Sequence, residues 1–351
     1  MKKICIALFL MIIGASSIVA PVSADDAISF GVQKSNEGDS KGDNSSYFDL
    51  TVKPGDELTL ETNIFSKSKK AIVVDSKIFT AYTNSNGIID YTSKAKKYDK
   101  SLKTKLSDIA EIHASDLKAE VQPEQRRTVK ADIKVPDTAP DGVILGSWYF
   151  TLAEDEKDAE TKGISNRYAY SIGIKLTVNQ EIDKPNLNLT SVTTGVHDYQ
   201  KAFFANFQND QRAILSNLEI TAKVTKRGSY DVLYENHTEG VSMAPNSNYA
   251  YPVKLGKDLM KPGEYTMRVK ATTTDPKWAE KTWTWDMDFT VLKKDVDEAN
   301  KAAIRDPKPN PFPWLLLIIV VAIALLLIFF IFLLWKRRKK KEEEEKKNEN
   351  K

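Results

Sequence analysis

The sequence predicts an all-β protein: two tandem immunoglobulin-like β-sandwich domains with one short inserted helix, followed by a single C-terminal transmembrane helix. Three observations support this prediction. Apolar and polar residues alternate with a period of two through most of the chain, as in half-buried antiparallel strands. Turn-forming pairs such as Asn86-Gly87 and Pro262-Gly263 separate these stretches at short intervals. Near the C-terminus, a run of 22 residues without a charge (314–335) is long enough to cross a bilayer.

Residues 1–24 have the pattern of a secretory signal peptide. Lys2 and Lys3 precede an apolar stretch, and Val22-Ser23-Ala24 has the small residues of a cleavage site before Asp25. We therefore expect an exported mature chain that begins at Asp25. The only cysteine of the chain, Cys5, lies in this segment, which excludes a disulfide scaffold, a cysteine zinc cluster and a cysteine nucleophile.

The first domain is predicted to span residues 25–180. Period-two alternation is clear at 148–152 and again at 172–178, which predicts two strands with one buried face. Between residues 101 and 111, four apolar residues follow a helical spacing instead and predict the one inserted helix: Leu102, Leu106, Ile109 and Ala110. Residues 34–46 read as a flexible polar loop.

The second domain is predicted to span residues 184–292. A polar segment at 179–186, which contains Pro185, separates it from the first. Its clearest strands are 265–271 and 283–291. In the latter, one face is apolar throughout: Trp283, Trp285, Met287, Phe289 and Val291.

Residues 293–313 are assigned to a stalk, with a short helical pattern from Asp295 to Ala303. Proline at every second position from Pro307 to Pro313 predicts an extended, semi-rigid spacer. The transmembrane segment 314–335 has a Trp at each end, and six basic residues open the tail 336–351. This asymmetry predicts a single-pass protein of the cell membrane, with the N-terminus and both domains extracellular and the C-terminus cytoplasmic.

Charge and residue pattern argue for a binding protein and against an enzyme or a nucleic-acid partner. The net charge is only +3, and residues 25–335 are slightly acidic, with 40 basic and 43 acidic residues. No cofactor or metal is expected, because His113, His197 and His237 lie far apart in the sequence. Asp286 and Asp288 share one strand face and could serve glycoside hydrolysis, although aspartates are common on a wet strand face.

Several short motifs, taken in their order, resemble a known family. In the first domain they are Tyr47-Phe48-Asp49-Leu50, Pro54-Gly55, residues 81–91 and residues 141–146. In the second they are Gln208-Asn209, residues 243–247, residues 262–265 and Trp283-Thr284-Trp285. Together with the order of segments, they resemble the WxL-interacting proteins of Gram-positive bacteria.

The resemblance implies a cell-surface adhesion protein with a peptidoglycan-binding domain followed by a host-binding domain. It implies three partners besides the lipid bilayer: peptidoglycan, WxL-domain surface proteins and host extracellular matrix proteins. Two other readings stay open. One is an extracellular scaffold or sensor subunit that does not bind the wall, and the other is a wall-active glycosidase.

The resemblance does not assign binding residues, so the candidates come from local composition. A loop tip rich in Asn, Asp and Tyr supplies the peptidoglycan candidates: Asn84, Asn86, Asp90 and Tyr91. An apolar turn segment supplies the partner-binding candidates: Met243, Pro245, Asn246, Tyr249 and Tyr251. The alternatives are a well-made hairpin turn for the first set and closure of the sandwich core for the second.

Overall fold

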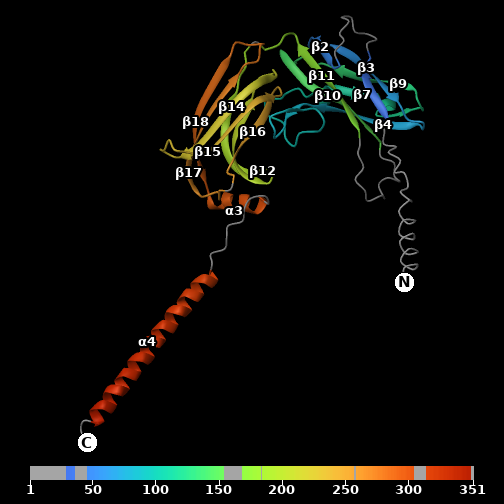
Figure 1. Ribbon diagram of the computed structural model, residues 1–351. Helices are drawn as coiled ribbons and strands as arrows, with labels where there is room; N and C mark the ends of the chain where they lie inside the picture. The colour runs from blue at the N-terminus through green and yellow to red at the C-terminus, as the bar shows by residue number, and fades with distance from the viewer. Residues whose placement is uncertain are drawn as a thin grey trace, which may run out of the picture. The chain divides into compact units, whose positions relative to one another are not determined.

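The computed structural model describes residues 29–35, 46–153, 168–182, 184–256, 258–303 and 314–348. The predicted signal peptide (1–24), most of the polar loop at 34–46 and residues 304–313 of the predicted stalk lie outside these ranges. The β-strands and helix α3 fall in one compact unit, and helix α4 falls in a second unit, which is described by itself. The first unit contains two β domains, which Figure 1 draws in blue to green and in yellow to orange.

The first domain consists of two sheets that face each other across a shared core. The first sheet has the strand order β1-β3-β9-β7 and the second the order β2-β11-β10-β4-β8. Neighbouring strands are antiparallel, except that β2 runs parallel to β11. The bounds are β1 Phe30–Lys34, β2 Phe48–Val52, β3 Glu57–Ser66, β4 Ile72–Thr80, β7 Ala110–Ile112, β8 Lys118–Val121, β9 Arg126–Lys134, β10 Gly142–Leu152 and β11 Ala169–Val178. A separate two-stranded hairpin is formed by β5 Tyr82–Thr83 and β6 Ile89–Asp90.

Alternation along each strand builds this core. In β9, for example, every second residue from Val129 to Ile133 is buried, and the residues between them are exposed. Trp148 and Phe150 are fully buried on β10, with ring centroids 5.2 Å apart. The strands predicted at 148–152 and 172–178 lie within β10 and β11, because their apolar faces are the ones that close the sandwich.

The inserted helix is shorter than its apolar pattern suggests. Helix α2 comprises only Leu106–Ile109, and a 3-10 turn, Ala114–Asp116, follows it after β7. Lys105 makes no side-chain cap, and Ala110 already has extended backbone angles, so the helix has little to sustain it at either end. Leu106 is nevertheless fully buried, because Gly146 leaves the space above β10 that Leu106 fills.

The second domain also consists of two sheets. One has the order β12-β13-β16 and the other the order β15-β14-β17-β18, and neighbouring strands are antiparallel. Their bounds are β12 Asn188–His197, β13 Gln200–Asn209, β14 Leu215–Lys226, β15 Val232–Met243, β16 Ser247–Lys254, β17 Gly263–Thr273 and β18 Lys281–Val291. The strands predicted at 265–271 and 283–291 lie within β17 and β18. Phe203 joins the two sheets through ring contacts with Tyr234, Tyr265 and Phe289.

The second domain continues beyond residue 292, where the sequence analysis places its end. Helix α3 comprises Lys293–Ala302, close to the helical pattern noted at 295–303. It begins with a hydrogen bond from the Leu292 amide to the Asp295 carboxylate (3.0 Å), and Val296 and Ala299 are buried in the core of the second domain. Residues 293–303 therefore belong to the folded domain in this structure, and only 304–313 are left for a spacer.

Helix α4 comprises Trp314–Asn348. Within it, Leu317–Lys339 is long and apolar enough to cross a membrane. The helix begins at the Trp that opens the predicted transmembrane segment and continues into the charged tail.

Candidate functional site

The two segments singled out from the sequence, one in each domain, lie against each other. The β5–β6 hairpin of the first domain meets the turn between β15 and β16 of the second. The Ser242 amide donates to the Gly87 carbonyl oxygen (2.8 Å), and the Ala244 amide donates to the Thr83 hydroxyl (3.0 Å). The Thr83 hydroxyl also lies 2.6 Å from that of Ser247. These segments therefore form an interface inside the chain.

Asp99 is the most connected residue of this interface. Its carboxylate accepts hydrogen bonds from Gln208 Nε2 and Asn248 Nδ2 of the second domain, both at 2.9 Å. It also accepts bonds from the amide and hydroxyl of Ser101 in its own domain. Burial alone would raise the pKa of Asp99, but these hydrogen bonds outweigh it and lower the pKa to about 2. The charged form of Asp99 is therefore the one that fits the interface.

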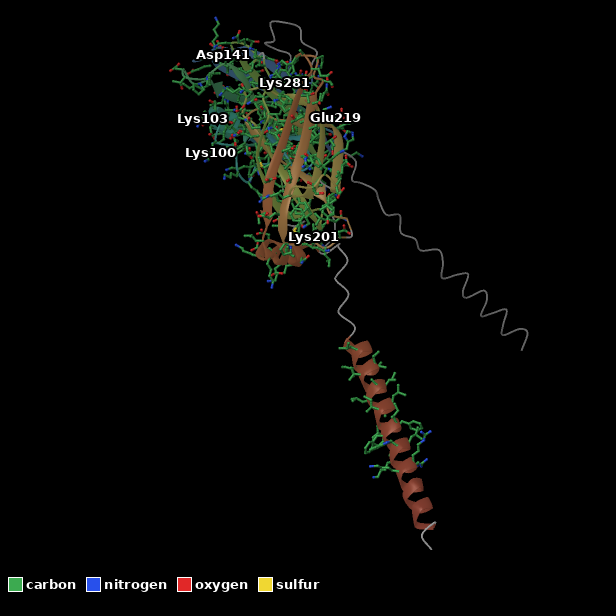
Figure 2. All side chains as sticks on the ribbon, turned by 90° about the vertical axis from the view of Figure 1, so that its left-hand side faces the viewer. Lys100, Lys103, Asp141, Lys201, Glu219 and Lys281 are labelled. Carbon is green, nitrogen blue, oxygen red and sulfur yellow. The ribbon has the colours of Figure 1, made fainter. Side chains whose placement is uncertain are left out.

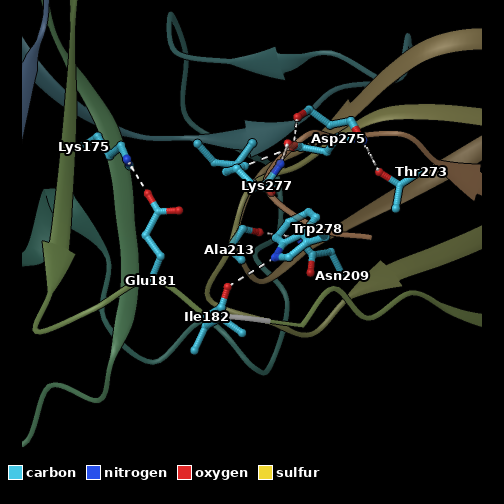
Figure 3. A network of polar contacts seen from close by, with 11 residues as sticks. Lys175, Glu181, Ile182, Asn209, Ala213, Thr273, Asp275, Lys277 and Trp278 are labelled. Carbon is cyan, nitrogen blue, oxygen red and sulfur yellow. Dashed lines mark hydrogen bonds and ion pairs between the residues drawn. The ribbon is translucent and has the colours of Figure 1, made fainter. Parts of the chain in front are cut away.

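The connection between the domains is held by a second set of polar contacts, drawn in Figure 3. Lys175 on β11 pairs with Glu181 (2.5 Å), and the indole of Trp278 donates to the Ile182 carbonyl oxygen (3.4 Å). Lys277 lies 3.6 Å from the Asp275 carboxylate and donates to the carbonyl oxygen of Ile214. These contacts fix the segment that leads from the first domain into the second.

Three of the four peptidoglycan candidates belong to the hairpin itself, and two of them accept hydrogen bonds that stabilise it. The Asn84 side-chain oxygen accepts from the amides of Asn86 and Ile88, and Asp90 accepts from the hydroxyl of Tyr82 and the amide of Thr92. Asn86 is exposed at the tip. These contacts are those of a well-made turn, which was the alternative for this loop. Tyr91 differs, because its side chain lines a pocket.

The five partner-binding candidates are buried: Met243, Pro245, Asn246, Tyr249 and Tyr251. Asn246 donates to the Ser101 hydroxyl and the Asp210 carbonyl oxygen, which places it in the interface. Tyr251 is fully buried in the core and donates to the Ile220 carbonyl oxygen (3.0 Å). Their positions match the alternative that they close the sandwich, and contact of these side chains with a partner stays a prediction.

The Tyr91 pocket opens on the outer face of the β2-β11-β10 sheet and has a volume of about 470 Å³. Gly173 forms part of its floor, where a Cβ would lie 3.4 Å from that of Tyr47. Tyr47, 42% exposed, and Tyr91 line the pocket. The remaining lining residues are Thr92, Leu145, Ser171, Ile174, Lys175 and Ile214. The pocket is mostly apolar, and Lys175 is the one cation among its lining residues.

Local contacts fix the two tyrosines. The buried Ser147 hydroxyl donates to the backbone oxygen of Tyr91, and the Tyr47 hydroxyl donates to Asp49 (3.4 Å). Burial raises the pKa of Tyr91, and the nearby phenol of Tyr47 raises it further. The Tyr91 phenol is therefore neutral at pH 7, and both rings offer faces and hydroxyl groups to a neutral ligand.

Lys175 is the cation of the pocket, and two carboxylates hold it. It lies 2.5 Å from Glu181 and 3.5 Å from Asp49. Burial would lower the pKa of Lys175, but the bond to Glu181 and the charge of Asp49 outweigh burial and raise it. Its charge is thus already balanced, so the pocket has no strong preference for an anion.

Sequence reasoning found Tyr91 as a candidate and Tyr47 only as part of a motif, and it missed Gly173 and Lys175. One signal could have found Gly173. A glycine inside a period-two strand leaves a gap in one face, and such a gap often marks the close approach of another group.

A larger groove of about 960 Å³ crosses the other sheet of the first domain. Six of its fourteen lining residues are charged, and several of these charges have close partners. Lys134 pairs with Glu57 (2.6 Å), and His113 lies 2.9 Å from Asp132. No aromatic ring lines this groove.

The residues that could have supported catalysis are held in ion pairs. Asp286 lies 3.4 Å from Arg268, and Asp288 lies 3.3 Å from Arg227 and accepts from the Thr266 hydroxyl. Among the residues that the structure describes, no cluster of three His, Cys, Asp or Glu side chains could hold a metal ion.

Comparison with solved structures finds distant likenesses. A CupB2 chaperone of Pseudomonas aeruginosa shares 11% identity over 68% of this chain and 96% of its own, with a TM-score of 0.27. A SafA pilin–SafB chaperone complex of Salmonella enterica shares 12% over 76% and 99%, with a TM-score of 0.29. A PapD-like domain of human CEP192 shares 7% over 48% and 97%, with a TM-score of 0.26. At scores this low we draw no conclusion from them.

Family models identify the chain more directly. No curated protein matches it. The model described as "WxL Interacting Protein, peptidoglycan binding domain" matches residues 30–152. The model described as "WxL Interacting Protein, host binding domain" matches residues 159–301, which includes nearly all of α3. Because the two models follow each other along most of the chain, this protein belongs to the WxL Interacting Protein family.

Proposed function

We propose that the first domain binds the glycan of peptidoglycan in the pocket between Tyr47 and Tyr91. The observation that supports this is the pair of tyrosines beside a glycine floor. The apolar faces of amino sugars stack on aromatic rings, and phenol hydroxyls can bond to sugar hydroxyl and acetamido groups. The volume of about 470 Å³ is in the range of small-ligand sites.

The charge of the pocket favours the glycan over the acidic groups of a stem peptide. Lys175 is neutralised by Asp49 and Glu181, so little cation remains to attract a carboxylate. We therefore expect binding that depends only weakly on salt, since steering by a large opposite field is absent. The larger charged groove is a poorer candidate, because it offers no ring for stacking.

Co-sedimentation of the ectodomain, residues 25–310, with insoluble peptidoglycan tests this proposal. Tyr47→Ala should release most of the bound protein. Tyr168→Ala is the matched control, because Tyr168 is 40% exposed on the same domain but does not line the pocket. Undiminished binding by Tyr47→Ala would move the site elsewhere on the domain.

Gly173→Leu separates binding from stability. Gly173 lies in strand β11 and lines the pocket, so a leucine side chain there would fill it. Leucine also suits the backbone of a strand better than glycine. We expect this variant to lose binding while its thermal unfolding temperature stays the same or rises. If no variant changes sedimentation and the wild-type ectodomain does not sediment at all, the alternative of a scaffold or sensor without wall binding is the better description. Release of soluble glycan by the ectodomain would instead favour the glycosidase.

The membrane half of the proposal concerns α4. We propose that it anchors the protein as a single-pass helix, with both domains outside and the tail 336–351 in the cytoplasm. The apolar stretch Leu317–Lys339 and the basic residues at its end support this. Protease added to protoplasts should remove the ectodomain and spare the tail, and an ectodomain that resists digestion would mean the reverse orientation.

The second domain is proposed to bind proteins, with WxL-domain surface proteins first and host matrix proteins second. Strand β18 supports this, because among the strands that the structure describes it pairs only with β17 and lies at the edge of its sheet, where a partner strand could pair. Calorimetry of the ectodomain with a purified WxL-domain protein tests it, and absence of binding to either class would remove the assignment.

The immunoglobulin-like class of both sandwiches is also a proposal. In the second domain, three strands on one sheet (β12, β13, β16) and four on the other follow the order typical of such domains. In the first, β1 and β2 divide between the two sheets, as the first strand of these folds does. A crystal structure of the ectodomain would test this classification.

A further inference from the structure

The exposed apolar side chains of the second domain gather at one end. Among residues 184–256 and 260–303, the large apolar side chains that are exposed are Tyr199, Tyr230, Val232, Leu233 and Leu292. Tyr199 lies in the turn between β12 and β13, and Tyr230 in the turn between β14 and β15. Leu292 directly follows β18.

Strand pairing and core contacts show that these turns share an end. Thr225 pairs with Val232 and Lys226 with Tyr265, while Gly263 pairs with Val291. Phe203, near the start of β13, packs on Tyr265 and Phe289, so the two sheets end together. In Figure 2, Lys201 lies at this end beside α3, and Lys281 lies at the opposite end of the domain. We call this the α3 end.

The chain leaves the domain from the α3 end. Helix α3 begins immediately after Leu292, and Val296 and Ala299 hold it against the core. The ten residues 304–313 then separate this domain from Trp314, the first residue of α4. Ten residues span at most about 36 Å, whatever their conformation. The α3 end is therefore tethered by a short chain to the apolar helix.

Tyr230 is held outward by its neighbours. It is 85% exposed, and the Arg268 guanidinium lies 4.8 Å from its ring centroid. Arg268 also donates to the Ser229 carbonyl oxygen (3.2 Å), which fixes the turn. A preorganised, exposed ring beside aliphatic side chains has the composition found at membrane interfaces, where amphipathic rings lie at headgroup level.

We propose that the α3 end of the second domain rests on the surface of the bilayer that α4 crosses, with Tyr230, Val232 and Leu233 in the headgroup region. This rests on the proposed anchoring by α4. Lipid is favoured over a protein partner because the short tether keeps this end near the bilayer. Two of the basic residues there are paired, Arg227 with Glu264 and Lys254 with Asp198. Contact should therefore depend mainly on insertion of the apolar side chains.

The test uses the full chain in phosphatidylcholine–phosphatidylglycerol vesicles that contain lipids with a nitroxide headgroup. Cys5 is replaced by Ser, so Tyr230→Cys provides one site for an environment-sensitive fluorophore. The matched control is Glu280→Cys, an exposed position at the opposite end of the same domain. We expect several-fold stronger lipid quenching at 230 than at 280, with a blue shift only at 230.

A second variant keeps the test informative if the probe disturbs the turn. With the probe at Tyr199→Cys, replacing Val232 and Leu233 by Ser should reduce quenching several-fold in a protein that is still folded by circular dichroism. Equal, weak quenching at 230 and 280, in vesicles where the tail is protected from protease, would overturn the proposal and leave the anchor intact. An unprotected tail, or chain removed by carbonate washing, would refute the anchor itself. A blue shift at 230 that grows with protein density without lipid quenching would place a second copy there and would also overturn the proposal.

Discussion

Asp99→Ala should uncouple the two domains. The change removes the acceptor for Gln208 and Asn248 across the interface and for Ser101 within the first domain. A hydrogen bond to a charged group contributes about 1.5–3 kcal/mol when buried. Asp99 is partly exposed, so solvent screening lowers this contribution.

The pKa of Asp99 gives a second measure of the same interaction. A fall from 3.8 to about 2 corresponds to roughly 2.4 kcal/mol at about 1.36 kcal/mol per pKa unit. Reduced by about half for solvent screening, this is roughly 1 kcal/mol. Both routes therefore predict a loss of about 1–2 kcal/mol, or a fall of about 2–6 °C in the unfolding temperature.

Differential scanning calorimetry of the ectodomain measures this effect. Wild type should unfold in one main transition, and Asp99→Ala should broaden it or divide it into two. Asp108→Ala is the control, because Asp108 pairs with Lys105 on the same domain away from the interface. A double-mutant cycle with Gln208→Ala should show coupling of at least about 0.5 kcal/mol. The reasoning is wrong if Asp99→Ala unfolds like wild type, or if Asp108→Ala costs as much.

Three further predictions concern the acid stability that Asp99 provides, the backbone at Gly87 and the C-terminal boundary of the second domain. The pKa of Asp99 in the folded protein lies below its ordinary value, so the stabilisation that Asp99 gives the fold is complete above about pH 4 and is lost as the pH falls toward about 2. The Asp99→Ala variant should therefore lose less stability than wild type across this pH range. Parallel acid titrations of the two proteins by circular dichroism would argue against this role of Asp99. Gly87→Ala should lower the free energy of unfolding in urea by about 2–4 kcal/mol, because Gly87 has φ +70° and the new Cβ would lie 2.9 Å from the Tyr249 ring. Gly228 has a similar φ but open surroundings, so Gly228→Ala should show only the cost of the backbone strain. Equal losses in the two variants would exclude a contribution from the ring contact. Val296→Ala should destabilise the second domain by about 1–2 kcal/mol, because Val296 is buried in its core. Asp297→Ala, at an exposed position of the same helix, should not. Equal thermal unfolding of the two variants would mean that α3 belongs to the stalk and not to the domain.

Local pattern was sufficient for the strands and insufficient for the helix. The alternation of 283–291 predicts β18 because each side chain meets the same face for the whole length of the strand. Four apolar residues at helical spacing overestimate α2, because Ala110 pairs with Ile133 of β9 and so continues as strand. The helical pattern at 295–303 predicts a helix close to α3, but one sequence does not show that this helix packs on the core.

The candidate site depended on contacts between distant segments, which one sequence does not reveal. The pocket joins Tyr47, Tyr91 and Gly173, and the parallel pairing of β2 with β11 is what places Tyr47 beside Gly173. The sequence leaves Tyr249 open as a partner-binding residue or as part of the sandwich core, and it does not show that Gly87, far earlier in the chain, packs against its ring. Composition could therefore suggest Tyr91, but it could not separate interface residues from ligand-binding residues.

The hydrogen bonds between the β5–β6 hairpin and the second domain have a mechanical consequence. If the first domain binds the wall and α4 crosses the membrane, as proposed above, tension must pass from one domain to the next. The connection at Glu181 and Ile182 would take that load alone if the domains only followed each other along the chain. Thr83 with Ser247, and Asp99 with Gln208 and Asn248, provide parallel routes for the force. Bonds that share a load rupture together at a higher force, so the pair of domains should resist stretching as one body before either begins to unravel.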